Sequence, residues 1–196
     1  MEIIWEWAHH TVYSQDSNWV VKIPRNWNPI SWNQANNSLA FFQEYFSTYM
    51  PETHLEKWRK DIPYFVLQKR VHGILLCNYL SDDDIMPSSD ILSKLKIFTE
   101  RAYKIIQDQW RGFDIIGTPI HPKDKRQWSG CTNFMVSPEN SELFFIDSIA
   151  WSKTLSLPSL VCKIWSKIIP AYKKRERLTK QLLLDLIKQD HENTWP

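Results

Sequence analysis

Glycine is scarce in this sequence: only four of the 196 residues are glycine, at positions 73, 112, 117 and 130. Glycine most readily adopts the left-handed backbone of tight turns, and it lines the loops that wrap phosphate groups with backbone amides. No glycine precedes position 73, and the four form no cluster. The sequence therefore excludes the common glycine-rich phosphate-binding loops, and few turns with a left-handed backbone are expected.

The size and charge of the chain fit an ordinary globular protein. With 43% hydrophobic and 23% charged residues, the composition is that of a folded chain, and the length suffices for one compact domain or two lobes. Lys and Arg number 24 against 22 Asp and Glu, which gives a net charge of +2. This balance does not favour binding to nucleic acid or another polyanion.

The cysteines and the apolar runs indicate the cellular compartment of the protein. Cys77, Cys131 and Cys162 are widely spaced, and no pair has the spacing of a zinc site or a disulfide framework. We therefore expect reduced thiols in a cytoplasmic protein. No apolar run reaches 18 residues, and no basic and then apolar leader opens the sequence, so neither a membrane span nor a secretory signal is expected.

The first 73 residues carry the patterns of a small sheet with one helix. Runs of β-branched and aromatic residues indicate strands, and apolar residues at helical spacing, such as Leu39, Phe42 and Phe46, indicate a helix. Ser31 is suited to cap that helix, and Pro51 would stop it. The elements predicted here are strands over 11–13, 19–23 and 64–68, a helix over 32–50, and a short helix or a loop over 52–62.

The remaining residues are mainly helical in pattern. The clearest helix is predicted over 90–110, opened by Ser89 or Asp90. The other predicted elements are a polar connection over 80–89, a long loop over 112–132, a β-hairpin with strands at 133–136 and 143–147, and two helices within 158–190 separated by Pro170. Together with the N-terminal patterns, they predict an α+β protein.

Four residues stand at positions that can carry chemistry. Lys22 ends a predicted strand, and Glu44 lies on the following helix. Asn133 and Asp147 stand at the two ends of the predicted hairpin. Each also has an ordinary interpretation: the two charged residues before the hairpin as solvated side chains, Asn133 as a turn residue and Asp147 as a helix cap. Taken together, the four resemble the pattern of the protein-kinase-like fold and the small phosphotransferases related to it.

The resemblance runs from about residue 10 to residue 150. The segment 19–22, Trp-Val-Val-Lys, looks like the V-A-I-K strand of the family, and the segment 65–73 looks like its hinge. Residues 133–136 look like the strand that follows the catalytic loop. Ile146-Asp147-Ser148 looks like the D-F-G segment, with Ser where Phe is usual.

This resemblance implies a fold, a ligand and roles for the matching residues. The fold would have two lobes: a reduced N-terminal sheet with one helix over 1–73, and a short, mainly helical C-terminal lobe over 74–196 that carries the hairpin 133–147. The ligand would be ATP with Mg2+. In the family pattern, Lys22 would contact phosphate, Glu44 would orient Lys22, backbone groups near Lys69 and Arg70 would face the adenine, and Asn133 and Asp147 would hold magnesium.

The sequence departs from the family pattern where catalysis is concerned. No glycine-rich loop precedes Lys22, and no A-P-E segment follows Asp147. The catalytic aspartate should stand five residues before the hairpin asparagine, but Trp128 occupies that position. An indole cannot accept a proton as a carboxylate does. Asp124 is the candidate replacement for the missing base, and His121 is a second one.

These departures lead us to expect a minimal kinase-like protein of the pseudokinase type. Such a protein would act as a regulatory or interaction module, with a protein partner and a retained capacity to bind nucleotide. Tryptophans such as Trp5, Trp110 and Trp151 suit a protein interface. Two alternatives stay open. One is an active atypical phosphotransferase that uses ATP, because positioning and metal electrostatics supply most of the rate in this chemistry. The other is an unrelated α+β protein-binding domain.

Overall fold

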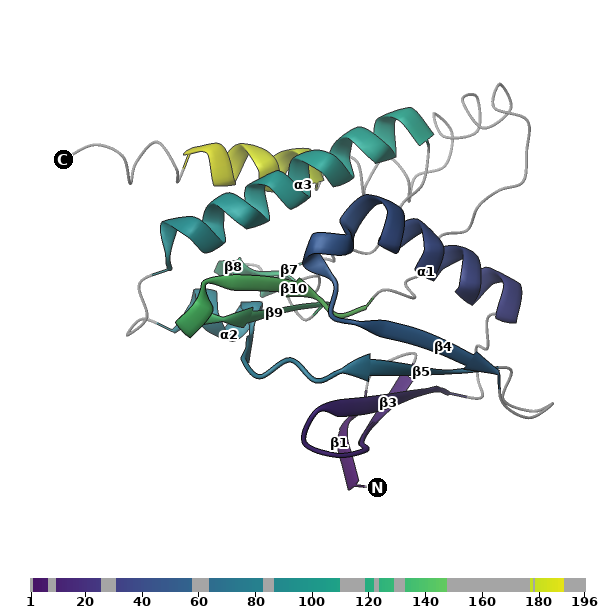
Figure 1. Ribbon diagram of the computed structural model, residues 1–196. Helices are drawn as coiled ribbons and strands as arrows, with labels where there is room; N and C mark the ends of the chain where they lie inside the picture. The colour runs from purple at the N-terminus through teal and green to yellow at the C-terminus, as the bar shows by residue number, and fades with distance from the viewer. Residues whose placement is uncertain are drawn as a thin grey trace. The chain divides into compact units, whose positions relative to one another are not determined.

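The chain divides into two units. The computed structural model describes residues 2–6, 10–25, 31–57, 64–82, 87–109, 119–121, 124–128, 133–147, 177 and 179–188 (Figure 1). One unit contains residues 1–72 and 144–149, and the other contains residues 73–143 and 150–196. The segment 144–149 therefore belongs with the N-terminal residues, although it is distant from them in sequence.

A five-stranded antiparallel sheet forms most of the first unit. Its spatial order is β1-β2-β3-β5-β4, which puts β3 at the centre, between β2 and β5. Alternate residues of a strand point to the same face, and on β5 the buried set is Tyr64, Val66 and Gln68. The strands are β1 (Glu2–Glu6), β2 (His10–Ser14), β3 (Trp19–Pro24), β4 (Thr53–Lys57) and β5 (Tyr64–Lys69). The strands predicted at 11–13, 19–23 and 64–68 are thus confirmed.

Helix α1 (Trp32–Phe46) begins where the sequence predicts. The Ser31 hydroxyl oxygen accepts a hydrogen bond from the Gln34 backbone N–H at 3.3 Å, and the Gln34 side-chain oxygen accepts one from the Ser31 backbone N–H at 3.0 Å. This reciprocal capping box satisfies two amide groups at the start of the helix. After Phe46 the chain tightens into the 3-10 turn η1 (Ser47–Tyr49), so the α-helix is shorter than predicted.

Aromatic side chains of α1 pack into the core of the first unit. Phe42 is only 1% exposed, and its ring lies 5.8 Å from the ring of Phe46. It also stacks on Phe145, with the ring centroids 5.0 Å apart. Because Phe145 belongs to the segment 144–149, this contact attaches that segment to α1.

The expectation of a short helix or a loop over 52–62 is wrong for the residues that the structure describes. Thr53–Lys57 forms β4, an edge strand that pairs with β5. Its sequence, Thr-His-Leu-Glu-Lys, lacks apolar alternation, and only Thr53 is buried. Charged side chains are common on exposed edge strands, and the pairing partner rather than local sequence decides the conformation. Residues 58–62 lie outside the described residues.

The second unit contains the long helix α3 (Ser89–Gln109), which confirms the helix predicted over 90–110. Phe98 on this helix packs edge-on against Phe134, with ring centroids 5.0 Å apart. The predicted apolar stripe of the helix is buried: Ile91, Leu95, Phe98, Ala102, Ile105 and Ile106. The shorter elements of this unit are β6 (Ile74–Leu75), α2 (Leu76–Ser81), β7 (Pro119–His121), β8 (Asp124–Trp128), β9 (Phe134–Ser137) and the 3-10 turn η3 (Pro138–Asn140).

The predicted β-hairpin is confirmed. β9 leads through η3 and Ser141 into β10 (Glu142–Phe145), and the sheet order is β10-β9-β6. Ser141 takes up the left-handed backbone, with φ of 52°, in a turn that has no glycine. Lys94 on α3 donates a hydrogen bond of 2.7 Å to the Ser141 carbonyl oxygen. Helix α3 therefore holds the turn of the hairpin in place.

The long loop predicted over 112–132 is wrong in part. Within this range β7 and β8 form an antiparallel hairpin, although their sequences show no apolar alternation. The other residues of the range lie outside the described part. Of the two helices predicted within 158–190, residues 177 and 179–188 are helical, and the rest lies outside that part. None of the described helices combines the length and apolar character needed to cross a membrane.

Gly73 stands where the backbone approaches β9 closely. A Cβ atom at this position would lie 2.2 Å from the Val136 carbonyl oxygen, much closer than any real contact. We expect Gly73→Ala to lower the free energy of unfolding by about 1–3 kcal/mol, because the β6–β9 pairing must shift. Urea denaturation measures this. Glu139→Ala, at an exposed position of the same hairpin, should change it by less than about 0.5 kcal/mol; equal effects would contradict the close approach.

Candidate functional site

Buried polar side chains gather on one face of the five-stranded sheet. In the register of the ladder, Val12, Lys22 and Val66 lie in one row across β2, β3 and β5. Residues two positions away along each strand share this face. The buried polar residues on it are His10, Lys22, Thr53 and Gln68, at 4%, 6%, 6% and 2% exposure, together with Tyr64 at 1%. This concentration marks the face as the candidate site, because buried polar groups need partners.

Lys22 occupies the centre of this face. Its ammonium nitrogen, Nζ, donates a hydrogen bond of 2.5 Å to the carbonyl oxygen of Ile146, which is 124 residues away in sequence. Burial lowers the pKa of the Lys22 ammonium from 10.5 to about 8, and the negative charge of Asp147 opposes part of this effect. Lys22 is therefore a cation that the protein holds with little hydration.

Asp147 follows β10 and is part-buried. Its charge acts on two buried groups of the first unit, the Lys22 ammonium and the Tyr64 phenol. Burial, and then the charge of Asp147, raise the pKa of Tyr64 above its usual value, so the phenol stays protonated at neutral pH. The ring of His10 lies 6.4 Å from that of Tyr64. The face thus carries a cation and a neutral phenol, and the charge of Asp147 acts on both.

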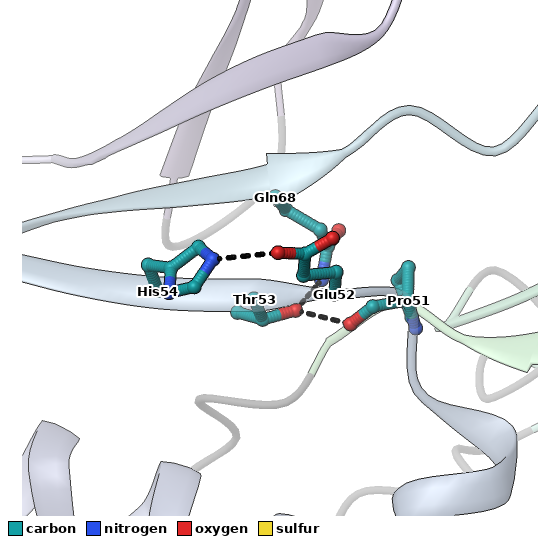
Figure 2. A network of polar contacts seen from close by, with 5 residues as sticks. All are labelled: Pro51, Glu52, Thr53, His54 and Gln68. Carbon is teal, nitrogen blue, oxygen red and sulfur yellow. Dashed lines mark hydrogen bonds and ion pairs between the residues drawn. The ribbon is translucent and has the colours of Figure 1, made fainter.

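A chain of hydrogen bonds connects the edge of the sheet with the same backbone carbonyl. The Gln68 side-chain nitrogen, Nε2, donates to Thr53 Oγ1 at 3.0 Å and to the Ile146 carbonyl oxygen at 3.4 Å. The Thr53 hydroxyl in turn donates to the Pro51 carbonyl oxygen at 2.7 Å. Figure 2 shows Gln68 of β5, Thr53 of β4 and Pro51, with the neighbouring hydrogen bond between the side chains of Glu52 and His54.

The predicted hinge residues lie at the end of β5. The Lys69 backbone N–H donates to the Glu52 carbonyl oxygen at 2.8 Å, and the Arg70 backbone N–H donates to the Asn18 carbonyl oxygen at 2.6 Å. A contact of this segment with a nucleobase stays a prediction. Both backbone N–H groups already donate hydrogen bonds within the protein, so a nucleobase would have to contact other groups of this segment.

The remaining predicted site residues stand on elements other than the five-stranded sheet. Glu44 is exposed on α1, so its pairing with the buried Lys22 stays a prediction. Asn133 stands just before β9. Asp124 opens β8, and its backbone pairs with that of His121. Asn133, Asp124 and His121 belong to the second unit. Among the described residues, no group of three or more His, Cys, Asp or Glu side chains is placed to hold a metal ion. Magnesium binding at Asn133 and Asp147 also stays a prediction.

Four residues of the polar face, His10, Thr53, Tyr64 and Gln68, were not singled out from the sequence. Tyr64 and Gln68 fall within a run that predicts a buried strand, and Thr53 falls within the segment expected to be a loop or short helix. Gln68 did carry a signal. It follows Tyr64 and Val66 at intervals of two residues, so on a strand all three side chains share one face. A buried amide on that face could therefore have been expected.

The chain was also compared with known proteins. No protein-family model matches the sequence, and no curated protein matches it. Among solved structures, the chain is similar to APH(2")-IIia in its complex with GDP and kanamycin, with a TM-score of 0.47 and 10% sequence identity. The similarity covers 99% of this chain and 93% of that one. The α+β class expected from the sequence is confirmed by the strands and helices described above.

Proposed function

We propose that this protein is a kinase-like module that binds ATP with Mg2+ through Lys22 and Asp147. The observation that supports this most directly is the buried Lys22 ammonium on β3, with the Asp147 carboxylate acting on it. An ammonium that loses its hydration destabilises the fold unless other groups compensate. The phosphate oxygens of a nucleotide would provide that compensation through charge-assisted hydrogen bonds.

Each residue of the proposed site has a chemical role. Lys22 would bind phosphate oxygens, and Glu44 would orient it. The part-buried carboxylate of Asp147 offers the oxygen ligand that Mg2+ prefers, and Asn133 would add another. The bound metal would neutralise phosphate charge. Backbone groups of the hinge segment 69–70 would face the adenine.

We propose binding, rather than phosphoryl transfer, as the main function. The indole of Trp128 stands in the position of the catalytic base, which supports a pseudokinase-type module that acts on a protein partner. In the alternative, an active phosphotransferase, Asp124 would replace the base. An assay of ADP release from Mg-ATP separates the two. Turnover that Asp124→Asn abolishes would favour the enzyme, and binding without turnover would favour the module.

Mg-ATP is expected to stabilise the native protein. A ligand at about 100 times its Kd adds about 2.7 kcal/mol to the free energy of unfolding. Asp147→Asn should remove the magnesium-dependent part of this stabilisation, because a neutral amide is a weaker magnesium ligand than a carboxylate. Thermal unfolding with ATP, in magnesium and in excess chelator, measures both effects.

The control for this experiment is Asp108→Asn, which makes the same chemical change at an exposed position of α3. It should leave the response to Mg-ATP unchanged. Equal stabilisation of wild type and Asp147→Asn would contradict the assigned site. An unchanged melting temperature of the wild type at millimolar Mg-ATP would contradict nucleotide binding altogether.

A further inference from the structure

The carbonyl oxygen of Ile146 accepts hydrogen bonds from two side chains. One donor is Lys22 Nζ at 2.5 Å, and the other is Gln68 Nε2 at 3.4 Å. Both donors are buried, at 6% and 2% exposure. This carbonyl directly precedes Asp147, so its donors act next to the proposed ligand site.

The direction of the Gln68 amide is set by its second partner. The Thr53 hydroxyl gives its only hydrogen to the Pro51 carbonyl oxygen, so toward Gln68 it can only accept (Figure 2). The amide must therefore turn its NH2 group, rather than its oxygen, toward Thr53. The second hydrogen of that NH2 group is then available to the Ile146 carbonyl oxygen.

We propose that Gln68 is a positioning residue that keeps the Ile146 carbonyl hydrogen-bonded when Lys22 leaves it to bind the phosphate groups of a nucleotide. This inference rests on the proposed function. A buried carbonyl that loses its donor is costly, because it gives up a hydrogen bond without regaining water. With Gln68 in place, the release of Lys22 leaves one donor behind, and the ammonium can move to the ligand at lower cost. Thr53 supports this role by orienting the amide.

A double-mutant cycle on the unliganded protein tests whether the two donors share the carbonyl. Gln68→Met removes both N–H donors with little change in length. With Lys22 present, the carbonyl keeps a donor, whereas in the Lys22→Met background it keeps neither. Gln68→Met should therefore lower the folding equilibrium constant about tenfold more in the Lys22→Met background. A residue that serves packing alone would cost the same in both backgrounds.

The second measurement is the affinity for Mg-ATP by calorimetry. Gln68→Met should raise Kd about tenfold, because the release of Lys22 then leaves the buried carbonyl without a donor. Thr53→Val keeps the Gln68 amide but removes its acceptor, so it should raise Kd by a smaller factor. This variant also keeps the test decisive if Gln68→Met fails to fold. The matched control is Gln43→Met, at an exposed position of α1, which should leave both Kd and the folding constant unchanged.

The outcomes separate the inference from the proposed function. Equal costs of Gln68→Met in the two backgrounds, with Mg-ATP binding retained, would overturn the inference alone. Absence of Mg-ATP binding in the wild type would overturn the proposed function and, with it, the release of Lys22. A larger cost in the Lys22→Met background, together with the weaker binding of Gln68→Met, would establish the role of Gln68.

Discussion

Lys22→Met is expected to stabilise the unliganded protein by about 2 kcal/mol at pH 7 and to abolish its response to Mg-ATP. The pKa of Lys22 is about 8 in the folded protein against 10.5 ordinarily. Each pKa unit corresponds to about 1.4 kcal/mol, so the charged form costs the fold about 3–4 kcal/mol. Methionine avoids this cost but loses the hydrogen bond to Ile146, which is worth about 1 kcal/mol.

Removing one partner of a buried ion pair usually destabilises a protein, because the other charge stays buried. Here Asp147 is only part-buried, so we expect its carboxylate to be hydrated when Lys22 is replaced. The lowered pKa also means that desolvation of Lys22 outweighs its attraction to Asp147. We therefore expect the gain to exceed the loss.

The effect of Lys22→Met should depend on pH in a defined direction. Below about pH 8 the ammonium is charged in both the folded and unfolded protein, so burying its charge lowers the free energy of unfolding by the full amount. Between about 8 and 10.5 the folded protein releases this proton while the unfolded chain keeps it, so the stability of the wild type rises with pH relative to the variant. The advantage of the variant should therefore shrink over this window.

Chemical denaturation at several pH values measures this difference. Lys104→Met, at an exposed position of α3, is the control, and it should change stability little and without this pH dependence. A variant less stable than the wild type at pH 7 would contradict the cost assigned to Lys22. A cation that lowers stability and is needed for ligand binding is a typical compromise between stability and function.

Local periodicity explains which elements could be predicted from the sequence. The stripe from Ile91 to Ile106 predicts α3, because its spacing alone requires an amphipathic helix. The hairpin at 133–147 follows from two apolar runs around a turn. By contrast, β4 and the β7–β8 hairpin have no apolar alternation, so their conformation depends on the strands they pair with. That dependence cannot be detected within the segment itself.

For the candidate site, only the resemblance supplied long-range information. Lys22 and Asp147 were assigned to one site through the family pattern, since no local rule relates two residues so far apart in sequence. The neighbours Tyr64, Gln68 and Thr53 depend on the register of β3, β5 and β4. Register is set by tertiary pairing, and a shift of one residue would turn these side chains to the other face.

Phe42→Ala is expected to lower the free energy of unfolding by about 3–5 kcal/mol. Phe42 is 1% exposed, stacks on Phe145 at 5.0 Å and meets Phe41 edge-on at 5.5 Å, so alanine would leave a cavity between α1 and the segment 144–149. This loss is a large part of the about 5–15 kcal/mol that holds a typical domain folded. Urea denaturation measures it.

The same substitution should also weaken Mg-ATP binding, because Asp147 stands two residues after Phe145 and depends on that strand end for its position. Phe42→Leu keeps most of the buried volume and should cost less than about 1.5 kcal/mol. Gln43→Ala, on the exposed side of the same helix, should cost about 0.5 kcal/mol or less. If Phe42→Ala cost no more than Gln43→Ala, the packing of α1 on Phe145 would not anchor the strand end that carries Asp147. In that case the position of the carboxylate would have to be set by its polar neighbours, Lys22 and Tyr64.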